Sequence, residues 1–177
     1  LSEYYNCPYK VQPLPVNSFA AIPGGDGKVM LKWSPTPDSK EPTAVSTGYI
    51  IYTRIDGGDF DSGVETTDTT ALMPVSKGHI YSYKVSAFND GGRSFPSEIL
   101  SVGFPEVQAR DTVLIVNNFD RVSAPAWVDT PAYAGFDGTK DSGVPYKYDI
   151  SFIGDNYDFD RTDEYIDDNR PGSGASH

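Results

Sequence analysis

A chain of 177 residues is long enough for one domain or two small ones, and its 12 Tyr and 9 Phe can fill a hydrophobic core. The 25 acidic side chains outnumber the 14 basic ones, so the formal net charge is −11 and nucleic acid is excluded as a partner. No apolar run is long enough to span a bilayer. Cys7 is the only cysteine, so the sequence predicts no internal disulfide.

The acidic residues are unevenly distributed along the chain. Fourteen of them lie in residues 106–177, and eleven lie in the longer stretch 1–105. This shift in composition predicts a module boundary near residue 105. Residues 1–14 contain Pro8 and Pro13 and predict either a linker from an upstream domain or a frayed terminus. The chain opens without an initiator Met or a signal peptide, and we expect it to belong to a longer polypeptide.

Residues 15–105 predict a series of short strands separated by turns. The expected strands are 16–22, 29–33, 48–54, 60–64, 70–73, 81–88 and 97–102. β-branched and aromatic residues fill these segments, and Gly and Pro lie between them. Because no helical period is present, the pattern predicts a mainly β fold, an antiparallel sandwich.

The expected strand 81–88 organises the others. Its apolar and polar residues alternate, which predicts one buried face with Tyr81, Tyr83, Val85 and Ala87 and an opposite face with Ser82, Lys84 and Ser86. Tyr81 follows a turn, so its hydroxyl can bond back to that corner while its ring is buried. On the second strand, Trp33 is the large inward residue.

The order of several of these residues resembles a fibronectin type III domain. They are Trp33, Leu72, Pro74, Tyr81, Val85, Ala87, Asn89, Gly92 and Ser97. The resemblance covers about residues 15–105 and implies a seven-stranded, immunoglobulin-like sandwich. It implies a spacer or binding module, and no catalytic residues come with it.

Residues 106–177 predict a second, different module. The uninterrupted apolar run 112–116 predicts a strand buried on both faces, as in a parallel sheet. A second strand is expected at 149–154 and a short helical segment at 162–169. Because no long amphipathic helix follows, we expect an incomplete α/β domain or an irregular segment. It would pack on the sandwich, dimerise, or continue beyond this fragment.

Four polar residues directly follow the apolar run: Asn117, Asn118, Asp120 and Arg121. In an open α/β sheet, the loop after the carboxyl end of a strand is a favoured ligand site, so these side chains are binding candidates. The alternative is that Asn and Asp only form the turn.

Seven acidic residues lie between positions 155 and 168. Carboxylate oxygens suit Ca²⁺, and Asp158, Asp160 and Asp163 are the candidate ligands. The spacing departs from an EF-hand loop, because Arg161 interrupts it and the required Gly is missing. A solvated acidic surface is the simpler interpretation, and paired carboxylates of a lyase or glycosidase are a third. We expect no other cofactor.

The sequence supplies little material for catalysis. His79 and His177 are the only histidines, so a zinc centre lacks ligands. There is no Gly-x-Ser-x-Gly nucleophile elbow. We therefore predict no catalytic residue in this chain.

Three further runs carry a second resemblance: VLIVNNFDRVS at 113–123, DSGVP at 141–145 and YIDDN at 165–169. They resemble the segment after a fibronectin type III domain in large secreted proteins of gut Bacteroidetes that are xanthan lyase-like or N-acetylmuramoyl-L-alanine amidase-like. This implies an extracellular or periplasmic setting and a parent enzyme whose zinc amidase domain lies upstream. The expected role is a non-catalytic spacer or interaction module, with neighbouring domains and a glycan or peptidoglycan as partners.

Two alternatives stay open. The first is a carbohydrate-binding module, in which tyrosine rings stack on sugars. The candidate rings are Tyr4, Tyr5, Tyr9, Tyr133, Tyr146, Tyr148 and Tyr157, and packing between modules is their other possible role. The second alternative is a fragment of an enzyme with its site in residues 117–121.

Overall fold

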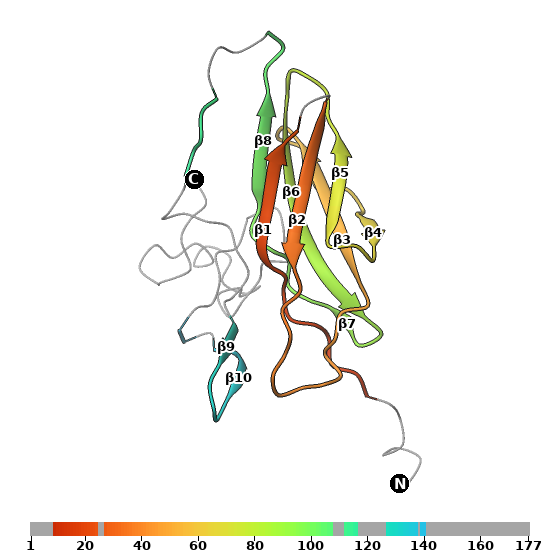
Figure 1. Ribbon diagram of the computed structural model, residues 1–177, viewed down its shortest axis with the longest axis vertical. Coiled ribbons are helices and arrows are strands. Elements are labelled where there is room, and N and C mark those ends of the chain that lie inside the picture. Colours follow the sequence, from red (N-terminus) through yellow and green to blue (C-terminus); the bar gives the residue numbers. More distant parts are fainter. Residues whose placement is uncertain (1–8, 25–26, 108–111, 117–126, 138, 141–177) are drawn as a thin grey trace, which may run out of the picture.

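The computed structural model describes residues 9–24, 27–107, 112–116, 127–137 and 139–140, and all regular structure in these residues is β-strand. The strands are β1 (Asn17–Pro23), β2 (Lys28–Ser34), β3 (Gly48–Ile55), β4 (Val64–Thr66), β5 (Thr70–Pro74), β6 (His79–Asn89), β7 (Gly92–Arg93), β8 (Leu100–Phe104), β9 (Trp127–Asp129) and β10 (Ala134–Phe136). Figure 1 shows that β1 to β8 form one elongated body and that β9 and β10 form a separate hairpin.

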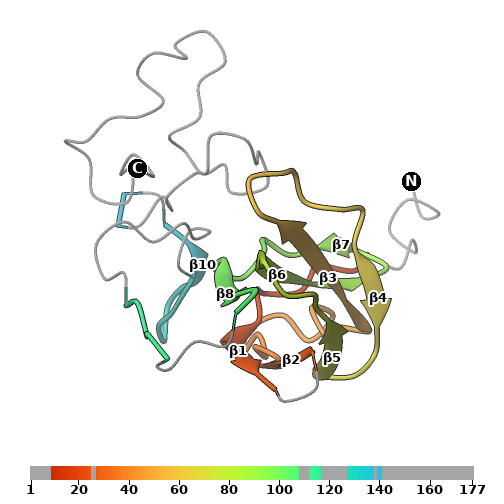
Figure 2. The ribbon, with the colours of Figure 1, turned by 90° about the horizontal axis from the view of Figure 1, so that it is seen from above.

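The body consists of two antiparallel sheets. One has the strand order β1-β2-β5, and the other has the order β4-β3-β6, with β7 and β8 pairing with opposite ends of β6. Seen from above, the two sheets lie over one another as two layers (Figure 2). This arrangement is that of a fibronectin type III sandwich, and it confirms the predicted mainly β fold.

The core between the layers is built from alternating residues. On β2, Val29, Leu31 and Trp33 are buried while the residues between them are exposed. The Trp33 ring meets the Tyr49 ring of the other sheet edge-on, with 5.5 Å between centroids. Aromatic pairs favour this geometry, so the contact ties the two sheets together.

The predicted tyrosine corner is confirmed. Tyr81 is buried, and the Ser76 backbone N–H donates a 2.9 Å hydrogen bond to its hydroxyl. Its ring stacks on that of Tyr83, which is fully buried. The corner therefore anchors the turn that leads into β6.

The prediction that β6 has only one buried face is wrong. Ser82, Lys84 and Ser86 are buried as well, and Lys84 is only 4% exposed. The polar groups are accommodated by local partners: the Ser82 hydroxyl lies 2.8 Å from that of Ser101, and the Lys84 ammonium lies 4.5 Å from the centroid of the Phe60 ring. A cation over an aromatic face keeps an attractive partner when water is removed. Strand β6 is thus the most enclosed strand of the sandwich.

Two predicted strand boundaries are also wrong. Of the expected strand 60–64 only Val64 is in a strand, because the Asp61 carboxylate accepts hydrogen bonds from the N–H groups of Thr53 and Gly63 and holds a turn there. The expected strand 97–102 begins only at Leu100. Before it, the hydroxyl of Ser97 accepts the Val85 N–H at 3.0 Å, where a paired strand would offer a carbonyl oxygen.

The buried strand expected at 112–116 is not present. The segment has no strand structure, and the side chains of residues 113–116 are between 74% and 85% exposed. A strand apolar on both sides needs strands beside it and cover on both faces, and the described residues supply neither. Instead of an α/β unit, the described part of 106–177 contains the antiparallel β9–β10 hairpin. The elements expected at 149–154 and 162–169 lie outside the described residues.

Within the described part of the chain, no helix has the length and hydrophobicity that a membrane crossing requires.

Two neighbouring tyrosines provide a test of the core. Tyr81→Phe removes the bond to Ser76 and should lower the free energy of unfolding by about 1 kcal/mol. Among the described residues the buried Tyr83 hydroxyl has no hydrogen-bond partner, so Tyr83→Phe should be neutral or stabilising by up to about 1 kcal/mol. Urea denaturation of the two variants measures the difference, and equal losses would contradict it.

Burial, and to a smaller extent Tyr81, raises the pKa of Tyr83 to about 12. The unfolded chain therefore loses this proton at lower pH than the folded chain, and the free energy of unfolding falls as pH rises above about 10. In Tyr83→Phe the free energy of unfolding should fall less as pH rises above about 10 than it does in the wild type. In Tyr81→Phe it should fall as it does in the wild type.

Candidate functional site

Most of the predicted site residues lie outside the described residues. These are the binding candidates Asn117, Asn118, Asp120 and Arg121, the calcium candidates Asp158, Asp160 and Asp163, and the tyrosines Tyr4, Tyr5, Tyr146, Tyr148 and Tyr157. The roles assigned to them stay predictions.

His79 has a structural role in the described residues. Its Nδ1 lies 2.8 Å from Oδ2 of Asp56, whose other oxygen accepts the Ile80 N–H. The backbone bond from Ile80, and secondly the contact with His79, lower the pKa of Asp56. This pair joins the end of β3 to the start of β6, its antiparallel neighbour in the sheet. No group of three or more His, Cys, Asp or Glu in the described ranges could hold a metal ion.

Two of the candidate tyrosines are described, and both are exposed. Tyr9 lies in the segment before β1, and Tyr133 lies in the β9–β10 hairpin. The Tyr133 hydroxyl donates to the carbonyl oxygen of Phe136, so its polar end is used inside the hairpin. Tyr9 presents a more accessible ring for stacking.

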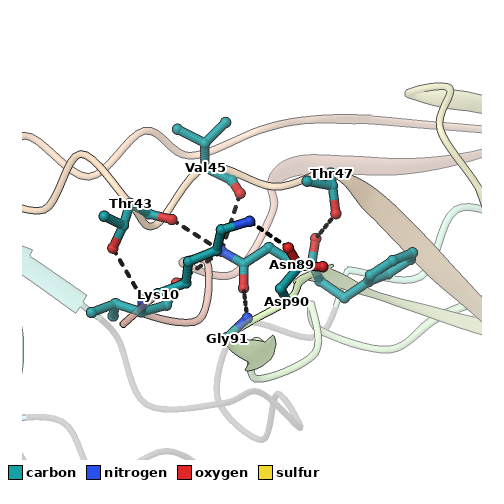
Figure 3. Close-up of polar contacts among 9 residues, drawn as sticks. Lys10, Thr43, Val45, Thr47, Asn89, Asp90 and Gly91 are labelled. Atoms are coloured by element: carbon teal, nitrogen blue, oxygen red, sulfur yellow. Dashed lines mark hydrogen bonds and ion pairs between the residues drawn. The ribbon is translucent and has the colours of Figure 1, made fainter. Parts of the chain in front are cut away.

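A cluster of polar contacts surrounds Asn89, close to the segment by which the chain enters the sandwich (Figure 3). The side-chain amide of Asn89, at the end of β6, donates to three backbone carbonyl oxygens: Val11 at 2.8 Å, Thr43 at 3.2 Å and Val45 at 3.2 Å. Its Oδ1 accepts the Gly91 N–H at 2.7 Å. Asn89 therefore joins the entering chain, the loop before β3 and the turn after β6.

Further bonds fasten the entering segment, residues 9–16, which we call the linker segment. The Val11 N–H donates to the Thr43 hydroxyl at 3.1 Å, and the Lys10 ammonium pairs with the Asp90 carboxylate. The hydrogen bond from Lys10, assisted by its charge, lowers the pKa of Asp90. Leu14 and Val16 are buried further along the segment. Part of the linker predicted for residues 1–14 is therefore attached to the sandwich.

Gly91 allows the linker segment to approach so closely. A Cβ atom at this position would lie 2.2 Å from the Lys10 carbonyl oxygen and 2.9 Å from the Val11 carbonyl carbon. Both are backbone atoms, which cannot rotate away as a side chain would. Any side chain at position 91 would displace the linker segment.

The β9–β10 hairpin contacts the sandwich at two described points. The Phe136 ring meets the Phe95 ring edge-on at 5.2 Å between centroids, and the Ser39 hydroxyl donates to the Asp129 carboxylate at 2.6 Å. Of the three alternatives for the second module, these two contacts of the hairpin agree with packing on the sandwich. The sandwich is thus contacted by the chain segments that precede and follow it.

The Asn89 cluster was not predicted from the sequence, where Asn89 entered only as one residue of the fibronectin type III pattern. Its partners Val11 and Thr43 are 78 and 46 residues away. The available signal was the match of Asn89 and Gly92 to the fibronectin type III pattern, which marks the position without giving its partners.

No protein-family model matches the sequence, and no curated protein matches it. Solved structures do. The twitchin kinase region from C. elegans is 26% identical over 56% of this chain and 18% of that chain, with a TM-score of 0.47. The third fibronectin III domain of the human KIAA0343 protein is 15% identical over 59% of this chain and 91% of that chain, with a TM-score of 0.46. The FN1-FN3 domains of chicken CNTN1 are 14% identical over 53% of this chain and 33% of that chain, with a TM-score of 0.45.

This chain therefore spans less than a fifth of the twitchin structure, although it spans most of the single human domain. The strand order and register described above, rather than these similarities, define the fold as a fibronectin type III sandwich.

Substitutions at Asn89 test the cluster. Asn89→Ala removes the donors to three carbonyl groups and should lower the free energy of unfolding by about 1–3 kcal/mol. Asn89→Asp keeps the acceptor for Gly91 but turns a carboxylate toward the carbonyl oxygens, so we expect a loss of more than about 3 kcal/mol. Linear extrapolation of urea unfolding gives both values.

The matched control is Asn17→Ala, because the amide of Asn17 makes a single 3.1 Å bond to the Thr36 hydroxyl. Its loss should stay near 1 kcal/mol or below (about the value of one hydrogen bond). A loss at Asn89 no larger than at Asn17 would show that the three-carbonyl arrangement adds nothing.

Proposed function

We propose that this chain is a non-catalytic spacer and interaction module that holds a preceding domain in a fixed orientation. The observation that supports this is the attachment of the linker segment to the sandwich through Asn89, Thr43 and Asp90. A linker that only joined two domains would need no such contacts, since a free segment spans the same distance.

The energetics favour a fixed rather than a loose connection. Ordering each backbone residue costs roughly 1–2 kcal/mol, so holding the linker segment requires several compensating contacts. Each hydrogen bond contributes about 0.5–1.5 kcal/mol, and burial of Leu14 and Val16 contributes about 1.5–3 kcal/mol each. These contacts therefore offset a large part of the cost of ordering the segment.

The proposed setting is a secreted multidomain protein that degrades polysaccharide or cell wall, outside the cell or in the periplasm. The resemblance of residues 113–123, 141–145 and 165–169 to xanthan lyase-like and N-acetylmuramoyl-L-alanine amidase-like proteins supports this setting. In such a parent, the catalytic groups belong to another domain, and residues 15–105 supply distance and orientation.

The carbohydrate-binding alternative has one supporting observation, the exposed ring of Tyr9. For a spacer, we expect the purified chain to pass unretained over immobilised xanthan and over peptidoglycan. Retention that is lost in Tyr9→Ala would favour the alternative, because an exposed aromatic face is the group that stacks on sugars.

A pair of glycine variants tests the fixed orientation. Gly91→Ala places a methyl group against the backbone of Lys10 and should detach the linker segment. We expect hydrogen exchange of the Val11 N–H to accelerate at least tenfold and NMR order parameters of residues 10–16 to fall below about 0.6.

Gly57→Ala is the matched control, because a Cβ at that position meets nothing within 4 Å. This variant should leave the exchange rate and the order parameters of the linker segment unchanged. A linker segment that is equally mobile in the wild type and in Gly91→Ala would overturn the proposal.

A further inference from the structure

An exposed apolar row crosses the outer face of the β1-β2-β5 sheet. The strand register places Ile22 opposite Met30 and Met30 opposite Leu72. Their neighbours Ala21, Leu31 and Met73 pack toward the core, so the three row residues point outward. Their side chains are 42%, 38% and 63% exposed, respectively.

The row lies in an unusual electrostatic setting. Lys28 and Lys32 are exposed on β2, two positions before and two after Met30. None of the residues of β1, β2 and β5 is acidic, although the chain as a whole carries a formal charge of −11. The charged residues of these three strands are therefore both lysines, and they lie on either side of an aliphatic centre.

The face is open to a partner. In Figure 1 the β1-β2-β5 sheet lies at the front, and no other strand of the described chain crosses it. On the opposite sheet, by contrast, both faces of β6 are buried. Exposed apolar positions with a lysine on either side along β2 make the front sheet a candidate docking surface.

We propose that this face binds an acidic amphipathic helix of a partner protein. Neighbouring strands are about 4.8 Å apart, so the three row residues span roughly 10 Å. Helix positions i, i+4 and i+7 span about 10.5 Å on one side of a helix, which matches the row. Carboxylates on either side of that stripe would reach Lys28 and Lys32, each about 7 Å from Met30 along the strand. The inference rests on the proposed role of the chain as an interaction module.

Other occupants fit the face less well. A second copy related by a twofold axis would bring Lys28 and Lys32 against lysines of the same face, which is repulsive. An acidic polysaccharide would find the lysines, but the aliphatic row offers no flat aromatic ring for a sugar. An extended peptide would pair with a strand edge rather than cross the face.

The contact should be weak. Three short strands present a face well below the roughly 800 Å² per partner of a stable interface, so we expect a Kd on the order of 10⁻⁴ M. Such a contact suits domains of one polypeptide or of one assembly, where the effective concentration is in the millimolar range.

NMR titration of the methyl signals of Ile22, Met30 and Leu72 tests the proposal. The probe is a helical peptide with Leu at i, i+4 and i+7 and Glu on both flanks, and its comparison peptide carries Lys in place of Glu. We expect the acidic peptide to shift these signals and to bind at least tenfold more tightly than the basic one. The charge-reversed variant Lys28→Glu/Lys32→Glu should reverse that preference.

A matched pair of variants localises the contact. Leu72→Ser should weaken the acidic peptide about tenfold, whereas Val64→Ser should not, because Val64 is 54% exposed on β4 of the other sheet. Gly91→Ala should also bind normally, so a failure here is distinguishable from a failure of the spacer role.

Three results would overturn the proposal. The first is that the acidic peptide binds no better than the basic one. The second is that soluble xanthan fragments shift the same methyl signals while the acidic peptide does not. The third is that sedimentation of the chain alone shows a dimer that Leu72→Ser abolishes. The last result would assign the face to a second copy.

Discussion

Burial of aromatic rings between the two sheets is the interaction on which the rest of the structure depends. Trp33 and Tyr49 join the sheets edge to face, and Tyr83 lies fully enclosed beside Tyr81. These contacts fix β6 at the centre of the larger sheet. Because Asn89 lies at the end of β6, the packing of the core also sets the place and direction of its amide, and with it the path of the entering chain.

The polar cluster around Asn89 depends on a particular chemical group. A side-chain amide carries two N–H bonds and one carbonyl oxygen, and here the N–H groups face three backbone carbonyls while the oxygen accepts from Gly91. A carboxylate has no donor, and a hydroxyl is too short to bridge three segments. Asparagine at this position therefore specifies one arrangement of the entering chain and excludes others.

Sequence patterns predicted the parts of this fold that neighbouring residues determine. The predicted strand 29–33 with Trp33 facing inward corresponds to β2, and the place of Tyr81 after a turn predicted its hydroxyl bond. Features that depend on distant partners were missed: the second buried face of β6, the three carbonyls around Asn89, and the exposure of residues 113–116, which pair with no strand in the part of the chain that the structure describes. The apolar pattern of a segment shows which of its side chains need to be buried, but it does not show whether the rest of the chain provides the strands and side chains that would bury them. The binding residues predicted at 117–121 and the calcium residues predicted at 158–163 lie outside the described residues, so their roles stay predictions.

The irregular segment between β7 and β8 has a consequence for solubility. Ser94 and Ser97 satisfy the backbone of β6 with their hydroxyls, and Pro96 between them has no N–H group. The edge of the larger sheet is therefore irregular between β7 and β8, where a continuous edge strand would present a regular row of backbone N–H and C=O groups. A sheet edge that is interrupted in this way resists pairing with the edge strand of another sheet. Where sandwiches follow one another in a polypeptide, at high local concentration, such an edge keeps neighbouring domains from pairing with one another.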